Sequence, residues 1–176
     1  MTFRRFHKRD APAPATLAFF KALIACGRER ASLPDSPART APELLYWVES
    51  QAFPWWLILA DKELAGCLYI TGIEGRRGFV HFAFLPGPDP VKMGRFILSS
   101  VLWDRDPGGR FLIDTLVGIT PAENKGALSL IERCGAVKVG VIPGFYYNHD
   151  KAKNTLATIT YCTRDTVPAE WGDNHG

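Results

Sequence analysis

The feature that most constrains the fold is an alternation of strand-like and helix-like runs in the second half of the chain. Two strand-like runs each lead through a short break into a helix-like run, at 78–85, 91–103, 111–119 and 125–134. This order predicts a crossover unit inside a mixed sheet, with the two helix N-termini opening on the same edge. Helix N-termini at strand ends are places where anionic groups such as phosphates bind. The function therefore depends on whether these two openings hold a cofactor.

The rest of the chain adds five strands and two helices to this unit. Strands are predicted at 2–7, 55–60, 64–73, 136–142 and 156–163, and helices at 15–26 and 41–49. The runs at 55–60, 64–73 and 78–85 are joined by short turns, which favours antiparallel pairing. We interpret 28–39 and 143–151 as loops and expect the polar tail, 165–176, to be frayed.

Length and composition indicate one globular domain of ordinary size. The chain has 176 residues, of which 47% are hydrophobic and 22% charged. We place a single domain at 1–164 and a polar C-terminal tail at 165–176. The net charge of +3 is mild, and we interpret the basic cluster at 4–9 as a solvated face, so a nucleic-acid partner is not expected.

The cysteines and the apolar segments bear on location and metal binding. The four cysteines are isolated in the sequence and form no CxxC pair, so we expect no zinc site and a reducing, cytoplasmic setting. No segment reaches the ~18 apolar residues of a membrane span, and the N-terminus lacks the apolar region of a signal peptide. A Cys–His nucleophile stays open, although each cysteine lies in core-like surroundings.

The run from 119 to 135 carries the most specific pattern. Pro121 cannot donate to a ladder, so it marks the end of strand pairing. Asn124 can cap the next helix or reach a ligand with its amide. The apolar positions of the helix form its buried face, at Ala127, Leu130, Ile131 and Cys134.

This run and the order of elements resemble the GNAT acetyltransferase superfamily over about residues 2 to 164. The resemblance implies an α/β (α+β) fold with a mixed, mostly antiparallel sheet of six or seven strands. It also implies helices on both faces and a splayed strand pair at 78–85 and 111–119. By the same resemblance, acetyl-CoA is the expected cofactor and Asn124 contacts its pantetheine arm.

The loop that should bind the cofactor's pyrophosphate is degenerate. GNAT proteins have an Arg/Gln-x-x-Gly-x-Gly/Ala run here, and only the last glycine is matched, by Gly94. Asp89 before Pro90 is a strong N-cap arrangement, which can occupy the amides that a phosphate would use. The resemblance implies cofactor contacts from this helix start, at Lys92, Met93, Gly94 and Arg95. Lys92 and Arg95 could hold a phosphate by side-chain charge, and an ordinary helix entry without a ligand is the alternative.

Acetyl transfer to an amine needs a base, an acid and an oxyanion partner. His81 is the ionisable side chain on the strand before the loop and is the candidate base, with a half-buried structural histidine as the alternative. By resemblance, the backbone N–H of Phe84 or Leu85 would be the oxyanion donor. GNAT members often have a tyrosine acid where this chain has Ile131. Tyr146 and Tyr147 are the candidate substitutes, and they could instead line an acceptor groove or pack.

Two functions follow from these features. The first is an N-acyltransferase that moves an acetyl group from acetyl-CoA to a small-molecule or protein amine. The second is a GNAT-fold module that has lost catalysis and serves in binding or assembly, such as one carried on phage-like or mobile DNA. For either function we expect no metal and no membrane partner, and we leave a homodimer open.

Overall fold

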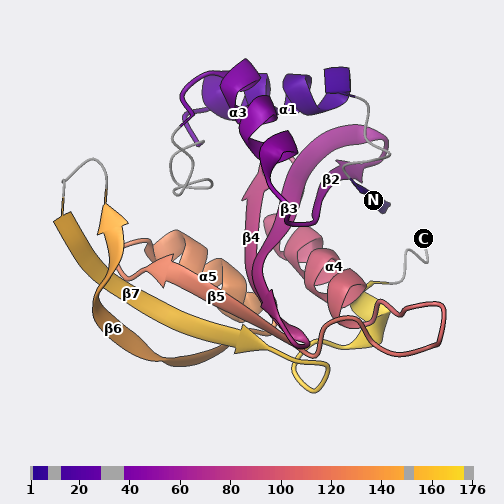
Figure 1. The fold of residues 1–176 in the computed structure, drawn as a ribbon, viewed down its shortest axis with the longest axis vertical. Helices are drawn as coiled ribbons and strands as arrows, with labels where there is room; N and C mark the ends of the chain where they lie inside the picture. Colours follow the sequence, from indigo (N-terminus) through magenta and orange to yellow (C-terminus); the bar gives the residue numbers. More distant parts are fainter. Residues whose placement is uncertain (1, 8–12, 29–37, 149–152, 173–176) are drawn as a thin grey trace. The chain divides into compact units, whose positions relative to one another are not determined.

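The computed structural model describes residues 2–7, 13–28, 38–148 and 153–172 (Figure 1). The predicted fold class is confirmed: helices accompany a seven-stranded, mostly antiparallel sheet with strand order β1-β2-β3-β4-β5-β7-β6. The chain divides into two compact units. Unit 1 comprises Met1–Gly72, Val80–Pro88 and Asn174–Gly176, and unit 2 comprises Ile73–Phe79 and Asp89–Asp173. The single domain at 1–164 remains a prediction.

Unit 1 joins an antiparallel set of strands to two helices. Its elements are β1 (Phe3–His7), α1 (Ala13–Ala25), α3 (Ala41–Ser50), β2 (Trp55–Ala60), most of β3 (Glu63–Glu74) and the second part of β4 (Arg77–Phe84). β2 pairs antiparallel with both β1 and β3. The turn between β2 and β3 has positive φ at Asp61 (48°) and Lys62 (76°). Two such central residues match the right-handed twist of the flanking strands, which explains a tight hairpin here.

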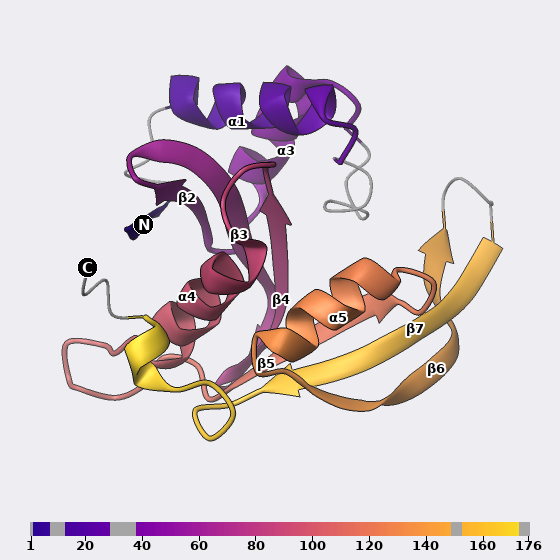
Figure 2. The ribbon, with the colours of Figure 1, turned by 180° about the vertical axis from the view of Figure 1, so that it is seen from behind.

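The helices of unit 1 cover an apolar core. Thr40 caps α3 through a capping box with Glu43, and a proline follows in the first turn. α1 and α3 lie side by side (Figures 1 and 2). Their inner faces meet residues of the strands in one cluster that includes Phe19, Phe20, Leu44, Trp55 and Tyr69.

Unit 2 contains the crossover. Its elements are the start of β4, α4 (Pro90–Leu102), β5 (Thr115–Pro121), α5 (Lys125–Arg133), β6 (Val137–Asn148), β7 (Lys153–Cys162) and a short 3₁₀ helix η1 (Ala169–Trp171). Residues 77–79 of β4 pair in parallel with 115–117 of β5, as predicted, and both strands continue beyond this short ladder. β7 pairs antiparallel with β5 and with the edge strand β6. Figure 2 shows α5 lying across one face of these strands.

The segment after β7 is folded, so our expectation of a frayed tail is wrong for residues 165–172. Val167 is fully buried, and its carbonyl oxygen accepts a hydrogen bond from Trp103 Nε1 at 2.9 Å. Ser99 Oγ on α4 donates to the carbonyl oxygens of Pro168 at 2.9 Å and Ala169 at 3.0 Å. The tail is polar in composition, but its backbone acceptors attach it to α4.

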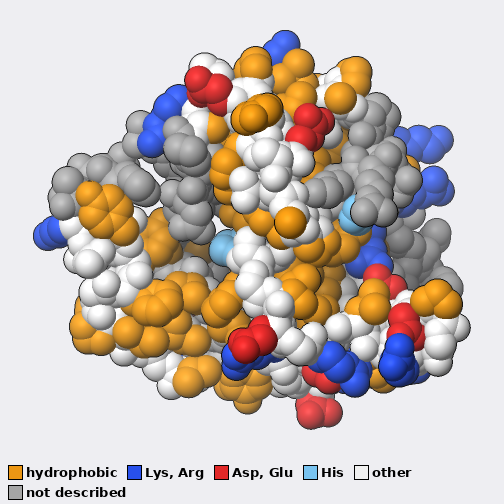
Figure 3. Space-filling model, in the orientation of Figure 1, with side chains coloured by type: hydrophobic (Ala, Val, Ile, Leu, Met, Phe, Trp, Pro, Cys, Tyr) orange, Lys and Arg blue, Asp and Glu red, His pale blue; other side chains and the backbone are white. Residues whose placement is uncertain are grey.

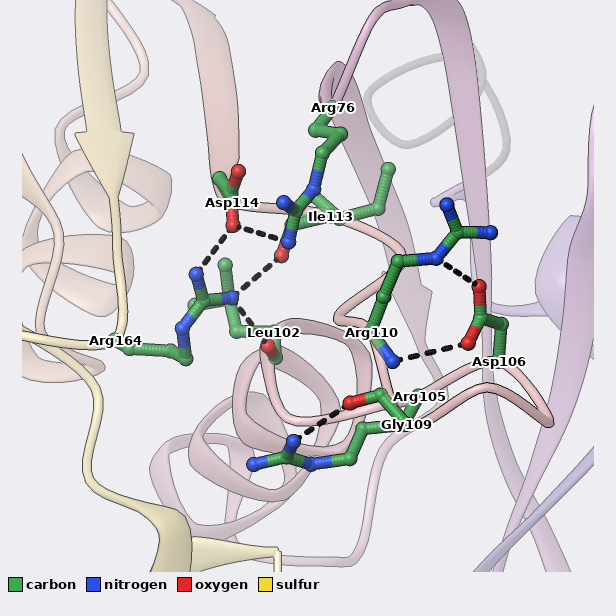
Figure 4. A network of polar contacts seen from close by, with 9 residues as sticks. All are labelled: Arg76, Leu102, Arg105, Asp106, Gly109, Arg110, Ile113, Asp114 and Arg164. Atoms are coloured by element: carbon green, nitrogen blue, oxygen red, sulfur yellow. Dashed lines mark hydrogen bonds and ion pairs between the residues drawn. The ribbon is translucent and has the colours of Figure 1, made fainter.

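A polar network anchors the start of this segment and the loop before β5 (Figure 4). Arg164 Nη1 donates to the carbonyl oxygens of Leu102 and Ile113, each at 2.9 Å, and its Nη2 pairs with Asp114. Arg76 contacts the same Asp114 carboxylate oxygen at 2.9 Å. The predicted strand at 111–119 therefore begins late, at Thr115. The ring of Phe111 instead lies between the guanidinium groups of Arg105 and Arg164.

Candidate functional site

The side chain of the N-cap residue of α4 accepts hydrogen bonds from the first backbone N–H groups of the helix. Asp89 Oδ1 accepts hydrogen bonds from the backbone N–H groups of Val91 at 2.9 Å and Lys92 at 3.2 Å. Pro90 has no N–H, and the Met93 N–H donates to the Asp89 carbonyl oxygen at 3.1 Å. These contacts, led by the Lys92 amide, hold the pKa of the Asp89 carboxyl below its ordinary value. A phosphate could use the amides only by displacing a carboxylate that also repels it.

Gly94 allows α4 to approach the C-terminal end of α5 closely. A Cβ at Gly94 would lie 2.5 Å from Cys134 Sγ, which is far inside an ordinary contact. The Cys134 thiol in turn lies 3.6 Å from the carbonyl oxygen of Val91. Helix packing therefore accounts for a glycine at this position, whether or not a cofactor binds.

The two helix N-termini predicted to open together are separated by the length of α5. The first turns of α4 lie against Cys134, which is the C-cap of α5, whereas Asn124 is its N-cap. Nine residues of α-helix span about 13.5 Å. One phosphate group cannot touch both N-termini, so only an extended ligand could use both.

Of the other residues predicted at the start of α4, Lys92 alone has an exposed side chain. Met93 is fully buried in the core. Arg95 Nε donates to the carbonyl oxygen of Arg133 at 3.2 Å, and its guanidinium carbon lies 4.4 Å from the ring centre of Trp171. Arg95 therefore links η1 and the end of α5 to α4, and Lys92 and the exposed Arg133 are the cations that act on the Asp89 end of α4.

Asn124 is an N-cap, as one of the two sequence interpretations predicted. Its Oδ1 accepts from the Ala127 N–H at 3.1 Å, and its backbone oxygen accepts from the Leu128 N–H at 3.1 Å. The cap uses the carboxamide oxygen, so the Nδ2 hydrogens can donate to another group. Capping and a ligand contact are therefore compatible at this residue.

His81 lies in unit 1 within an aromatic and hydroxyl environment. Its imidazole stacks on Tyr69 with ring centres 4.5 Å apart and planes 5° apart, and its Nε2 is 2.9 Å from Thr71 Oγ1. The two flanking phenylalanines of β4, Phe82 and Phe84, stack on each other instead, at 4.9 Å. The half-buried imidazole is thus held in one orientation, which suits either a base or a structural histidine.

At the end of β4, one of the two candidate oxyanion donors is already hydrogen-bonded within the sheet. The Leu85 N–H donates to the carbonyl oxygen of Ala65 at 2.8 Å, so this amide is used in the sheet of unit 1. The Phe84 carbonyl oxygen accepts from Arg28 Nη1 at 3.1 Å. Of the two predicted donors, the Phe84 N–H is therefore the better candidate.

Tyr146 and Tyr147 lie on a strand, so their predicted position in a loop is wrong. β6 extends to Asn148, and Tyr146 and Tyr147 face Thr155 and Asn154 across the β6–β7 ladder. As neighbours on a strand, they point to opposite faces. Only one of them can therefore serve a given site. Residues 149–152, which follow β6, lie outside the described residues.

The buried cysteines are poor nucleophiles. Burial raises the pKa of Cys67 and Cys162 to about 12 and that of Cys134 to about 11. Thiolates are the reactive form, so these three thiols are inert at neutral pH. Across residues 2–7, 13–28, 38–148 and 153–172, no group of three His, Cys, Asp or Glu side chains could hold a metal ion. In the same ranges, no helix has the length and apolar character to cross a membrane.

Comparison with solved structures identifies the fold. A Streptococcus pneumoniae acetyltransferase of the GNAT family superposes with a TM-score of 0.59 at 18% identity, over 92% of this chain and 98% of that one. The chain has a GNAT fold. A Salmonella typhimurium acetyltransferase that modifies the N-terminal serine of ribosomal protein L7/L12 gives a TM-score of 0.72 at 14% identity, over 93% and 95% of the two chains.

A third similar structure contains the cofactor. Spermidine N-acetyltransferase from Vibrio cholerae, in complex with CoA and spermine, gives a TM-score of 0.66 at 17% identity over 94% of this chain and 96% of that one. No family model matches the sequence, and no curated protein sequence matches it. The GNAT fold is therefore established by structure, at identities that leave the reaction to be tested.

Sequence reasoning missed the partners that hold the site residues of this GNAT fold. The Tyr69 ring and Thr71 hydroxyl around His81 alternate along β3, a period-two signal that a strand prediction could have used. Trp171, the partner of Arg95, lies in the segment that we expected to be frayed. Ile131, at the position where GNAT proteins often have a tyrosine acid, is buried on the inner face of α5, as predicted.

Proposed function

We propose that this protein is an N-acyltransferase that moves an acetyl group from acetyl-CoA to an amine. The observation that carries the proposal is the likeness to acetyltransferases over more than nine-tenths of both chains. Their acceptors, spermidine in one case and a protein N-terminus in another, leave a small or a protein amine as the acceptor class.

The residues present fit coenzyme A only in part. Asn124 and the exposed Lys92 could donate to the cofactor, by amide hydrogen bonding and by charge respectively. Met93, Gly94 and Arg95 lie within α4, the Met93 N–H donates to the Asp89 carbonyl oxygen, and the Asp89 carboxylate accepts from the Val91 and Lys92 amides, so this helix start is not arranged as an amide cradle. When bound, acetyl-CoA supplies an acetyl group activated as a thioester.

The proposed chemistry assigns one role to each group. His81 takes the proton from the acceptor ammonium; when its Nε2–H donates to Thr71 Oγ1, the lone pair on Nδ1 is the base. The amine nitrogen then attacks the acyl carbon, and the Phe84 N–H stabilises the charge that develops on the carbonyl oxygen. Tyr146 or Tyr147 would give a proton to the departing coenzyme A thiolate, and the proton that the new amide nitrogen must lose would restore that tyrosine.

A second function is favoured by one observation, the occupied N-terminus of α4. A GNAT-fold module without catalysis needs no phosphate site there, and a plain helix cap suffices. The two functions differ in whether coenzyme A binds at all.

Titration with coenzyme A separates them. Binding raises the free energy of unfolding by ~2.7 kcal/mol at a ligand concentration 100 times Kd. Asp89→Asn keeps a good N-cap and removes the anionic charge, so it should tighten binding by about 5-fold or more. The control is Asp106→Asn, a half-buried carboxylate of unit 2 that accepts the Arg110 N–H and pairs with the Arg110 side chain, and it should leave Kd unchanged.

The result decides the assignment. If millimolar coenzyme A raises the unfolding temperature of none of these proteins, the acyltransferase proposal is wrong and the binding or assembly module remains. If coenzyme A binds, His81→Ala should abolish acetylation of a mixed amine and peptide panel while Kd for coenzyme A stays the same. Full turnover in His81→Ala would dismiss His81 as the base.

A further inference from the structure

Three consecutive cross-strand rows of unit 2 place apolar residues on one face of its sheet. Residues directly opposite each other on paired strands point to the same side, and so do residues two apart along one strand. The recorded registers therefore define one surface. We name it the apolar sheet face, and its rows are Phe79, Val117, Tyr161 and Val137; Ile119, Ile159 and Gly140; and Pro121, Ala157 and Ile142.

Part of the opposite side of these strands is covered by the chain itself, although Val141 and Leu156 on that side are 45% and 51% exposed. Leu116, Thr158, Thr160 and Cys162 point there and are at most 2% exposed. Cys162 lies near enough to Cys134, at the end of α5, for the two thiols to influence each other's charge. Figure 2 shows α5 on this side, and the apolar sheet face is turned to the viewer in Figure 1. Figure 3, in the same orientation, shows hydrophobic side chains gathered over β6 and β7.

The apolar sheet face offers an area of the size that a dimer needs. Phe79, Val137 and Ile142 are 37%, 39% and 41% exposed, six further members are partly exposed, and Ala157 is buried. With side-chain areas of ~150–250 Å², the exposed apolar surface is roughly 400 Å². About 57% of the area of an interface is apolar. An interface that contains ~400 Å² of apolar surface from each copy would therefore bury ~700 Å² per copy and ~1,400 Å² in total, which is within the range of specific interfaces.

The lack of charged residues on the apolar sheet face favours an uncharged partner. None of the ten residues is charged, and the first charged side chain along the ladder is Arg77, in the row that pairs with Thr115. A nucleic acid or a highly charged peptide would find nothing to pair with. An identical copy presents an equally uncharged face, and a twofold axis makes such a face complementary to itself. Two twisted sheets pack face to face in this way in β-sandwiches.

We propose that the apolar sheet face is a self-association surface, which packs against the same face of a second copy of this chain. This assignment does not depend on acyl transfer, because it uses no residue of the candidate site. The face is built from paired strand residues of unit 2, so a dimer formed through it would be a property of the folded protein.

Two neighbouring residues of β6 provide a matched test. Ile142, paired with Ala157, belongs to the apolar sheet face, whereas Val141, paired with Thr158, points to the other side. They are 41% and 45% exposed, so a lysine should be tolerated equally at both. Sedimentation velocity on the full chain, from ~1 µM to ~500 µM, measures the monomer–dimer Kd. Wild type and Val141→Lys should dimerise with similar Kd, and Ile142→Lys should raise Kd by at least ~30-fold.

Several results would overturn the assignment. A wild type that stays monomeric to ~500 µM would overturn it. If this monomer co-sediments with uncharged phosphatidylcholine vesicles, the face binds lipid and not a second copy. Dimers that resist Ile142→Lys, or that Val141→Lys disrupts equally, would place the contact elsewhere. Should Ile142→Lys lose its native circular dichroism, the nearly isosteric Val137→Thr takes its place, with an expected few-fold rise in Kd; an unchanged Kd would count against the face.

Discussion

Gly94→Ala should change the free energy of unfolding with opposite signs in two backgrounds. In the wild type, the new Cβ would lie 2.5 Å from Cys134 Sγ, about 1 Å inside an ordinary contact. Overpacking of this kind costs about 2 kcal/mol, and alanine regains about 1 kcal/mol over glycine in helix propensity. The net expectation is a loss of about 1 kcal/mol.

Removing the sulfur should reverse this result. In Cys134→Ala the nearest remaining atom of residue 134 is its Cβ, at 3.6 Å, which is an ordinary contact. Only the propensity term then remains, so Gly94→Ala should stabilise this background by about 1 kcal/mol. The double-mutant cycle should therefore give a coupling free energy of about 2 kcal/mol.

Urea unfolding followed by far-UV circular dichroism measures all four proteins of the cycle. Gly126→Ala is the matched control, because this helical glycine of α5 has only Asn124 Oδ1 nearby, at 3.9 Å from an added Cβ. It should stabilise both backgrounds by up to about 1 kcal/mol. If Gly94→Ala stabilises the wild type as Gly126→Ala does, or if the coupling is below ~0.5 kcal/mol, the close approach of α4 to α5 is wrong.

Three further predictions test the caps and the thiols. The depressed pKa of Asp89 stabilises the fold above the carboxyl's unfolded pKa and loses this effect as pH falls through the folded pKa. Asp89→Asn should therefore lose less stability than the wild type in urea titrations between about pH 5 and pH 2. Thr40→Ala removes the capping box of α3 and should cost about 1 kcal/mol in the same assay, whereas Thr40→Ser should cost little. Ellman's reagent at pH 8 should react rapidly with one thiol, the half-buried Cys26, and with all four cysteines in urea; rapid reaction of a second thiol in the native protein would contradict the burial of the others.

Elements with local signals could be predicted closely from the sequence. β2 runs from Trp55 to Ala60 as expected, because a short turn bounds it on one side. The helix starts at α3, α4 and α5 follow their capping residues for the same reason. β6 could not be predicted beyond 142, since Pro143 and Gly144 normally end a strand. Here they occupy a shift in register on an edge strand, where a missing N–H is tolerated.

The candidate site was only partly predictable, because its contacts join distant parts of the chain. The cap at Asp89 could be predicted from the proline that follows it. The stacking of Arg95 on Trp171 could not, because it joins α4 to the end of the chain. The same holds for Gly94 and Cys134, which meet only once α4 and α5 pack. A sequence pattern shows that a glycine is present but does not show which neighbour requires it.

These contacts bear on how an anion could bind at α4. The amides of Val91 and Lys92 are satisfied by Asp89, and Arg95 is directed toward Trp171, so the side chains that oppose the charge of Asp89 are Lys92 and, at the end of α5, Arg133. Asp89 therefore offsets part of the positive charge that Lys92, Arg133 and the helix dipole place at this end of α4. A pyrophosphate would have to bind mainly through the exposed Lys92 and Arg133 side chains, and such exposed charge pairs are weak and screened by salt. If coenzyme A binds with micromolar affinity and with little dependence on salt, its binding energy must come mainly from contacts along the rest of the cofactor, with Asn124 the first residue to test.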